Sequence, residues 1–230
     1  MIDYLLSIFA SSLAMIAYIV YFLTVKKSGI IPNRLAWLIC SISVSLETIT
    51  YCYISNNNIR SLYFIVASLC TIVITIKIWK LARWENSSRI QKNSLIFYSF
   101  AIAIWPLFEL PFIAHLILLI AIPVTFFPIY KSAYKNYKTE NILPWLLWSI
   151  SDVFIIISIF VNMKTFRELP YALVSFICPF TVFAIIIFQR IRHFEGSQFP
   201  LFFIEKWMSL ERKYNSFTNT IAKFSAFNFL

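Results

Sequence analysis

Long uninterrupted apolar runs dominate this chain, and they limit what it can fold into. The runs are close to the roughly 20 residues that an α-helix needs to cross a bilayer core. The chain is 60% hydrophobic and only 13% charged, whereas a soluble domain is about half apolar and a quarter charged. The runs lack the short alternating pattern of a membrane β-barrel. The sequence therefore predicts an all-α integral membrane protein, because a helix satisfies its backbone hydrogen bonds inside lipid.

Seven membrane-spanning helices are predicted. The run 94–130 is too long for one span, and it contains Pro106, Glu109 and Pro111 near its middle. Because Glu109 would be costly inside lipid, we divide the run there into a fourth and a fifth helix joined by a tight turn. The other predicted spans are residues 4–23, 35–54, 61–78, 143–161 and 170–188.

Lysine and arginine fall mainly on one side of this seven-helix arrangement. Seventeen of the 20 lie on the side of the C-terminus, and only Arg60, Lys164 and Arg167 lie on the other. Cytoplasmic segments of membrane proteins carry this excess of positive charge. We therefore expect the N-terminus outside and the C-terminus in the cytoplasm. The same asymmetry explains the formal net charge of +10 without nucleic acid as a partner.

Two similar stretches indicate an internal repeat. Residues 31–39, Ile-Pro-Asn-Arg-Leu-Ala-Trp-Leu-Ile, and residues 141–148, Asn-Ile-Leu-Pro-Trp-Leu-Leu-Trp, each follow a lysine-bearing loop and begin an apolar segment. An ungapped alignment of the two stretches brings three distinctive pairs into one register: Trp37 with Trp145, Tyr63 with Tyr171 and Cys70 with Cys178. The sequence thus predicts two related units.

The predicted organisation is one three-helix unit, a linker and a second three-helix unit. These parts are residues 1–80, 81–110 and 111–190, followed by a cytoplasmic tail at 191–230. The linker helix lets the second unit cross the membrane in the same direction as the first, which makes the repeats parallel. Apolar residues at helical spacing between 200 and 214 predict an interfacial amphipathic helix in the tail.

This layout resembles the PQ-loop and SWEET superfamily of seven-helix membrane transporters, in which a basic loop also leads into each second helix. The run from Lys26 to Ile39 is similar to a bacterial group of membrane proteins with a Thr-Lys-Pro-x-x-x-x-Trp-x-x-Trp pattern. The resemblance implies a transporter of a small polar solute in a bacterial inner (plasma) membrane.

The chain departs from the superfamily at its named motifs. The Pro-Gln pair would fall at Val20-Tyr21 and at Pro128-Ile129, and only the proline of the second copy is present. In place of the sugar-binding asparagines, the nearest repeat-matched pair is Cys70 and Cys178. The resemblance therefore leaves the solute open, and it leaves Pro128 as a candidate hinge or gate residue.

Three ionisable residues are expected inside the membrane, where such residues are costly and mark functional sites. Asp152 lies near the middle of the sixth span, Glu47 beyond the middle of the second, and His115 near the outer end of the fifth. One hypothesis is a central cavity in which Asp152 and Glu47 bind a cation or relay protons, with His115 at its outer mouth. The alternative is that each side chain bonds a neighbouring helix and only fixes packing.

Tryptophans near the cytoplasmic start of the second and sixth spans also have two interpretations. We interpret Trp37 and Trp145 as gate or anchor residues of the interfacial aromatic belt. Trp148 lies a turn deeper and shares a helix face with Asp152, so it is a candidate for the cavity wall. Cys70 and Cys178 could line the same cavity or simply pack.

No enzyme signature and no cofactor site is predicted, because the chain has no nucleophile elbow, phosphate-binding loop or zinc-binding motif. The main hypothesis is a transporter or facilitator of a small polar solute, with proton coupling left open. A receptor or scaffold of the same fold, acting through its basic cytoplasmic face, is the first alternative, and a lipid enzyme using Glu47, His115 and Asp152 is the second. The expected partners are the solute and the bilayer, and the oligomeric state is left open.

Overall fold

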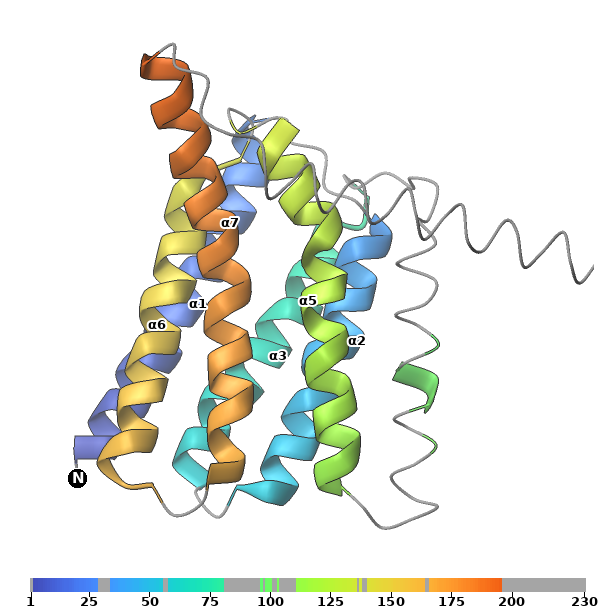
Figure 1. The fold of residues 1–230 in the computed structure, drawn as a ribbon, viewed down its shortest axis with the longest axis vertical. Coiled ribbons are helices and arrows are strands. Elements are labelled where there is room, and N and C mark those ends of the chain that lie inside the picture. The colour runs from blue at the N-terminus through green and yellow to red at the C-terminus, as the bar shows by residue number, and fades with distance from the viewer. Residues whose placement is uncertain are drawn as a thin grey trace, which may run out of the picture. The chain divides into compact units, whose positions relative to one another are not determined.

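The computed structural model describes residues 2–28, 34–55, 58–80, 96, 98–100, 103, 111–135, 137, 140–163 and 166–195. Every regular element in these ranges is a helix (Figure 1). The elements are α1 (Ile2–Ser28), α2 (Arg34–Ile54), α3 (Asn58–Ile78), α5 (Pro111–Lys135), α6 (Ile142–Val161), the short 3-10 helix η1 (Phe166–Glu168) and α7 (Leu169–Glu195). The chain forms two compact units, residues 1–190 and 191–230, and the description below concerns the first.

Six helices of the described residues are long and apolar enough to cross a membrane. The chain is therefore a multi-pass, all-helical membrane protein, as the apolar runs predict. Most of the predicted fourth helix, the turn around Glu109, the loop at 29–33 and the tail helix at 200–214 lie outside the described residues.

Helices α1 and α7 are longer than the sequence predicts. Both α1 and α7 have 27 residues, which corresponds to about 40 Å at 1.5 Å per residue. A bilayer core is only about 30 Å thick, so both helices continue beyond it. Hydrophobicity marks the part of a helix that lies in lipid, and therefore it underestimates the length of a helix that extends into water.

The six long helices surround a common interior. Helix α3 packs against α1 and α2, α1 packs against α6, and α2 packs against α5. Helix α7 contacts α6 through Ser175 and Asp152, and it contacts α3 through the stacked rings of Tyr171 and Phe64. Two buried apolar clusters, one above the other, each include residues from all six of these helices.

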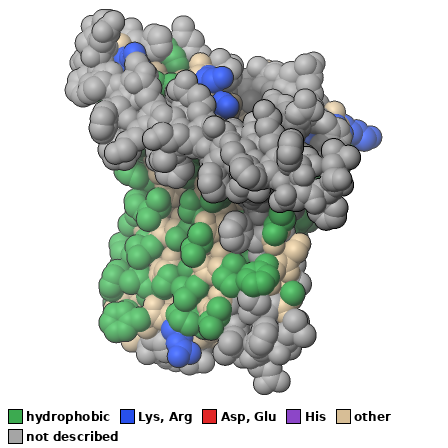
Figure 2. Space-filling view, turned by 45° about the vertical axis from the view of Figure 1, so that its right-hand side comes forward, with side chains coloured by type: hydrophobic (Ala, Val, Ile, Leu, Met, Phe, Trp, Pro, Cys, Tyr) green, Lys and Arg blue, Asp and Glu red, His purple; other side chains and the backbone are tan. Residues whose placement is uncertain are grey.

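Large apolar side chains cover the outside of the bundle, whereas many polar side chains lie inside. Ile120 and Tyr53 are each 71% exposed, and Figure 2 shows a broad hydrophobic band on one face. Serine, threonine, aspartate and glutamate side chains occur among the buried residues. This arrangement suits a lipid environment, in which apolar residues face outward and polar groups must find partners within the protein.

Hydroxyl side chains join α2 to α3, which explains how a chain with only 2 glycines packs its helices closely. Ser41 Oγ lies 2.6 Å from Thr75 Oγ1, and Ser45 Oγ lies 3.1 Å from Ser68 Oγ. Thr48 donates to the carbonyl oxygen of Phe64 across the same interface. Small polar residues at a helix interface allow close approach and supply interhelical hydrogen bonds.

The two ends of the bundle differ in charge. We name them the lower end, where α1 begins in Figure 1, and the upper end, where α2 and α6 begin. Among the described residues of the first unit, the lower end carries Arg60, near the start of α3, and Arg167, on η1. The upper end carries Lys26, Lys27, Arg34, Lys77, Lys80, Lys131, Lys135 and Arg190.

Candidate functional site

A cavity of about 90 Å³ lies inside the bundle, and all six long helices contribute to its lining. One water molecule requires roughly 10–15 Å³ of such space, so the cavity can hold several waters or one small solute. Drug-sized ligands occupy pockets of about 300–1,000 Å³, which is much larger. The predicted site residues that line this cavity are Trp37, Trp145, Trp148, Asp152 and Cys178.

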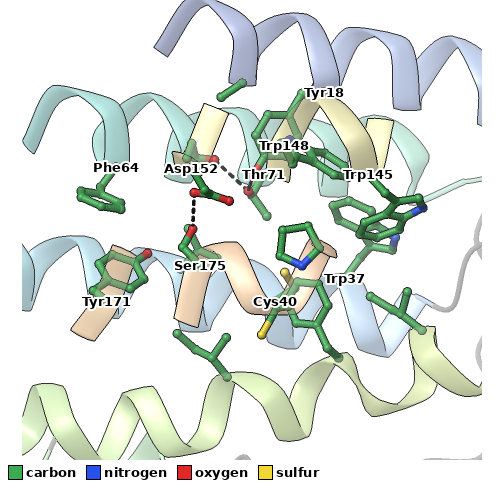
Figure 3. A pocket seen from close by; sticks show the side chains of 18 of the residues that line it. Tyr18, Trp37, Cys40, Phe64, Thr71, Trp145, Trp148, Asp152, Tyr171 and Ser175 are labelled. Atoms are coloured by element: carbon green, nitrogen blue, oxygen red, sulfur yellow. Dashed lines mark hydrogen bonds between the residues drawn. The ribbon is translucent and has the colours of Figure 1, made fainter. Parts of the chain in front are cut away.

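Asp152 is the carboxylate of the cavity, and it is almost fully buried, with 2% exposure. Its Oδ1 atom accepts a hydrogen bond from Tyr63 Oη at 2.6 Å. The same atom accepts a second hydrogen bond from Ser175 Oγ at 2.7 Å (Figure 3). Tyr63 comes from α3 and Ser175 from α7, so three helices meet at this carboxylate. Among the described residues that line the cavity, none is a lysine, arginine or histidine. No cationic side chain among these described lining residues neutralises Asp152.

Aromatic rings form a layer on the upper side of the cavity. The ring centroids of Trp145 and Trp148 are 5.0 Å apart, and those of Tyr18 and Trp148 are 4.9 Å apart. Trp37 donates from Nε1 to Tyr21 Oη at 3.2 Å. Trp37 and Trp145 are both buried, so they lie in the bundle interior and not in an interfacial belt facing lipid.

The indole nitrogen of Trp148 is a buried donor of this upper layer. Trp148 Nε1 is buried and has no hydrogen-bond partner among the residues that the structure describes. A buried donor without a partner is unfavourable, and Trp148 lines the cavity. A solute with an acceptor group could satisfy it.

Near the same layer, burial raises the pKa of Glu140, which lies just before α6.

A second aromatic layer closes the lower side of the cavity. Phe64 and Tyr171 stack with their centroids 4.5 Å apart, and Tyr51 packs against Phe64 at 4.3 Å. Figure 3 shows Phe64 and Tyr171 on one side of Asp152 and the tryptophans on the other. The carboxylate of Asp152 therefore lies between two aromatic walls of the cavity.

Glu47 and His115 form a buried pair below the cavity and are not among its lining residues. His115 Nδ1 lies 2.7 Å from Glu47 Oε2 and 3.1 Å from Thr50 Oγ1, and both side chains of the pair are fully buried. The pair joins α2 to α5. The hypothesis that Glu47 and Asp152 share one cavity does not match this placement, whereas the alternative of a bond between neighbouring helices describes Glu47 well.

A buried ion pair, which the sequence analysis did not identify, lies at the lower end. Arg60 Nη1 contacts Glu168 Oε2, and both side chains are fully buried. Arg60 Nη2 also donates to the carbonyl oxygen of Asn162 at 2.6 Å. The helix η1 places Glu168 beside α3. The repeat alignment contains a signal for this pair, because it sets Arg60 opposite Glu168.

The two remaining predicted site residues lie away from the cavity lining. Cys70 on α3 is half-buried, and Pro128 lies inside α5. Residues that the sequence analysis missed are Tyr18, Tyr63 and Ser175, because their role depends on contacts between distant helices. The described residues hold no cluster of three or more metal-ligating side chains. Comparison of the chain with protein-family models, curated proteins and solved structures gives no match.

Proposed function

We propose that this protein carries a small polar solute across a membrane through the cavity beside Asp152. One observation carries the proposal: an interior cavity lined by six membrane-length helices places a buried carboxylate between two aromatic walls, and the described lining residues include no cation. A carboxylate without a cationic partner is costly inside a membrane, and such groups mark substrate or ion pathways. If residue 152 only packed helices together, an apolar side chain would fill this position equally well.

The proposed carrier consists of two three-helix units, α1–α3 and α5–α7, as the resemblance to the PQ-loop and SWEET superfamily implies. Contacts related by one shift in residue number support this arrangement. Arg60 and Glu168, which pair with each other, are separated by 108 residues. A shift of 108 residues also takes Ser7 to His115 and Ser158 to Thr50. The bond between Ser7 and Ser158 therefore has an equivalent in the bond between His115 and Thr50.

This correspondence has a geometric meaning. The bond between Ser7 and Ser158 joins α1 to α6, and the bond between Thr50 and His115 joins α2 to α5. Exchange of the two units converts one interface into the other. A twofold axis along the membrane normal would produce this pattern, and it would bring Arg60 and Glu168 together near the axis.

Transport by this arrangement requires each end of the bundle to open in turn. The upper aromatic layer would have to separate around Trp37, Trp145 and Trp148. At the lower end, Arg60 and Glu168 would part, as would Glu47 and His115. Rocking of two units about a fixed central site is a common way to obtain such alternating access. The charge asymmetry supports an upper end that faces the cytoplasm.

Solute flux in liposomes tests the proposal. The purified protein is reconstituted, and uptake of labelled small solutes, including amines, amino acids, polyols and organic acids, is measured with and without a pH gradient. We expect saturable uptake of at least one solute, and we expect Asp152→Asn to reduce it by about tenfold or more. Asp3→Asn is the matched control, because Asp3 is also a buried aspartate but lies outside the cavity lining.

Two outcomes would overturn the proposal. The first is flux that Asp152→Asn and Asp3→Asn leave equally unchanged. The second is the lack of any protein-dependent flux across the whole panel. If the second outcome were combined with capture of a partner by the basic cytoplasmic face, the receptor or scaffold alternative would replace the carrier.

A further inference from the structure

We infer that the solute is a small organic monocation, an amine or a quaternary ammonium, whose positive group binds between Asp152 and the aromatic walls of the cavity. This inference rests on the proposed carrier function and names its substrate class. It follows from three properties of the cavity: its charge, its aromatic surfaces and its supply of hydrogen-bond donors.

The charge of the cavity favours a cation. Asp152 is the carboxylate of the lining, and the described lining residues include no lysine, arginine or histidine. Two hydroxyl donors converge on Asp152 Oδ1, an arrangement that stabilises negative charge on this oxygen. A buried carboxylate takes up a proton unless a cationic partner accompanies it. A monocation supplies that partner, and an anionic solute would be repelled.

The walls of the cavity suit an organic ammonium group. Tyr18 and Trp148 lie on the upper side, at a centroid distance of 4.9 Å, and Phe64 and Tyr171 lie on the lower side, at 4.5 Å. The faces of aromatic rings attract cations, and the attraction grows when the cation is desolvated. Methyl or methylene groups on the cation would pack against the same rings. A small hydrated inorganic ion would not use these surfaces.

The donors of the cavity are too few for a sugar or another polyol. Tyr63 and Ser175 both donate to Asp152, and Tyr18 Oη bonds Thr71 Oγ1 at 2.6 Å. A polyol must exchange many hydrogen bonds with water for bonds with the protein, and this lining offers few. Trp148 Nε1 is a buried donor without a partner among the described residues. One acceptor on the solute, such as a hydroxyl group, would satisfy it.

The size of the cavity limits the solute to a few heavy atoms. Its volume of about 90 Å³ is far smaller than that of a pocket for a drug-sized ligand. Choline and ethanolamine combine a single positive charge, one hydroxyl group and a small volume. They are therefore suitable probes, one for a quaternary and one for a primary ammonium group.

Binding to the purified, full-length protein tests the inference without transport. Tryptophan fluorescence is titrated with choline, with ethanolamine and with 3,3-dimethylbutan-1-ol, which is the uncharged isostere of choline. Sodium chloride at matched ionic strength is the control for salt. We expect a saturable signal with at least one of the two cations, and at least about tenfold weaker binding of the uncharged alcohol.

Two variants connect the signal to the site. Asp152→Asn is expected to remove the preference for choline over its uncharged isostere, and Asp3→Asn is expected to keep it. Equal binding of choline and the isostere to the wild-type protein would overturn the inference. A choline signal that survives Asp152→Asn, or that sodium chloride reproduces, would overturn it too.

The outcomes of the flux and binding experiments are separable. If a neutral or anionic solute crosses the liposome membrane in an Asp152-dependent manner and neither cation binds, the carrier function stands and the cation inference falls. If choline or ethanolamine binds through Asp152 but no labelled solute crosses, the cation site stands and the carrier function falls.

Discussion

The buried ion pair at the lower end gives a quantitative prediction about what holds the bundle together. Arg60 and Glu168 are both fully buried, and Arg60 also donates to the carbonyl oxygen of Asn162. Removal of one partner from a buried pair leaves an uncompensated charge and costs about 3–5 kcal/mol. Since each 1.4 kcal/mol is a factor of about ten, either Arg60→Met or Glu168→Leu should reduce the ratio of folded to unfolded protein by about 10² to 10⁴.

The double variant Arg60→Met/Glu168→Leu should behave differently. Replacement of a whole buried pair by apolar residues is often close to neutral, because the desolvation penalty of both charges disappears. We therefore expect the double variant to be more stable than either single variant. The non-additivity, measured as a coupling free energy in a double-mutant cycle, should be at least about 2 kcal/mol.

Denaturant unfolding in detergent micelles, followed by circular dichroism, measures these free energies. Arg167→Met is the matched control, because Arg167 is an exposed arginine on the same short helix as Glu168, and we expect it to have a much smaller effect. Single variants that are no less stable than this control, or additive effects in the cycle, would refute the reasoning. They would mean that the lower end is hydrated and does not contain a buried pair.

Three further predictions concern other parts of the first unit. Glu47→Leu removes the acceptor 2.7 Å from the buried His115 Nδ1 and should lower the free energy of unfolding by about 1–3 kcal/mol; an unchanged denaturation midpoint would contradict the pairing. Burial raises the pKa of Glu140, so the folded state binds more protons than the unfolded state, and stability should fall as pH rises above 4.5 and through the raised pKa. Glu140→Gln should flatten this part of the curve of melting temperature against pH, and an identical curve would speak against the burial. Trp148→Phe keeps an aromatic wall but loses Nε1, so the dissociation constant of the transported solute should rise about three- to tenfold, as measured by competition for uptake; unaltered affinity would exclude a hydrogen bond from Trp148.

The fold class follows from the sequence because a bilayer imposes one simple requirement. A span must be apolar over about 20 residues and helical, and hydrophobicity alone reports both conditions. The predicted starts of α2 and α6, at residues 35 and 143, each differ by one residue from the structure, which begins them at Arg34 and Ile142. Hydrophobicity gives less information about α1 and α7, whose ends leave the apolar layer.

The candidate site was only partly accessible to sequence reasoning. Asp152 stands out as a candidate in the sequence, because carboxylates in apolar runs are rare. Its partners Tyr63 and Ser175 do not, because tyrosine and serine are common in such runs and the contacts connect α6 with α3 and α7. A sequence pattern with a period of 3.6 residues describes one helix and carries no information about which helix packs beside it.

Glu47 shows a further limit of the same reasoning. The repeat alignment sets Asp152 opposite Val44, three residues before Glu47, and this spacing favours related faces for the two carboxylates. Three residues on an α-helix correspond to a rotation of about 300°, which leaves the two side-chain directions only about 60° apart, and to a rise of about 4.5 Å. The helix face alone does not separate the two carboxylates; their depth and the neighbouring helix do, because Glu47 bonds His115 on α5, below the cavity, while Asp152 faces the cavity.

Accessibility of one cavity cysteine from each side of the membrane tests the carrier mechanism most directly. Cys178 is buried and lines the cavity. Alanine replacements of Cys40, Cys52 and Cys70 leave it as the only thiol of the chain, since the protein has 4 cysteines. A small, membrane-impermeant methanethiosulfonate reagent is then applied to inside-out and to right-side-out vesicles, with and without the transported solute. We expect modification of Cys178 from either side and protection by the solute in both cases. Modification from one side only, or from neither, would contradict a cavity that opens alternately to the two faces of the membrane.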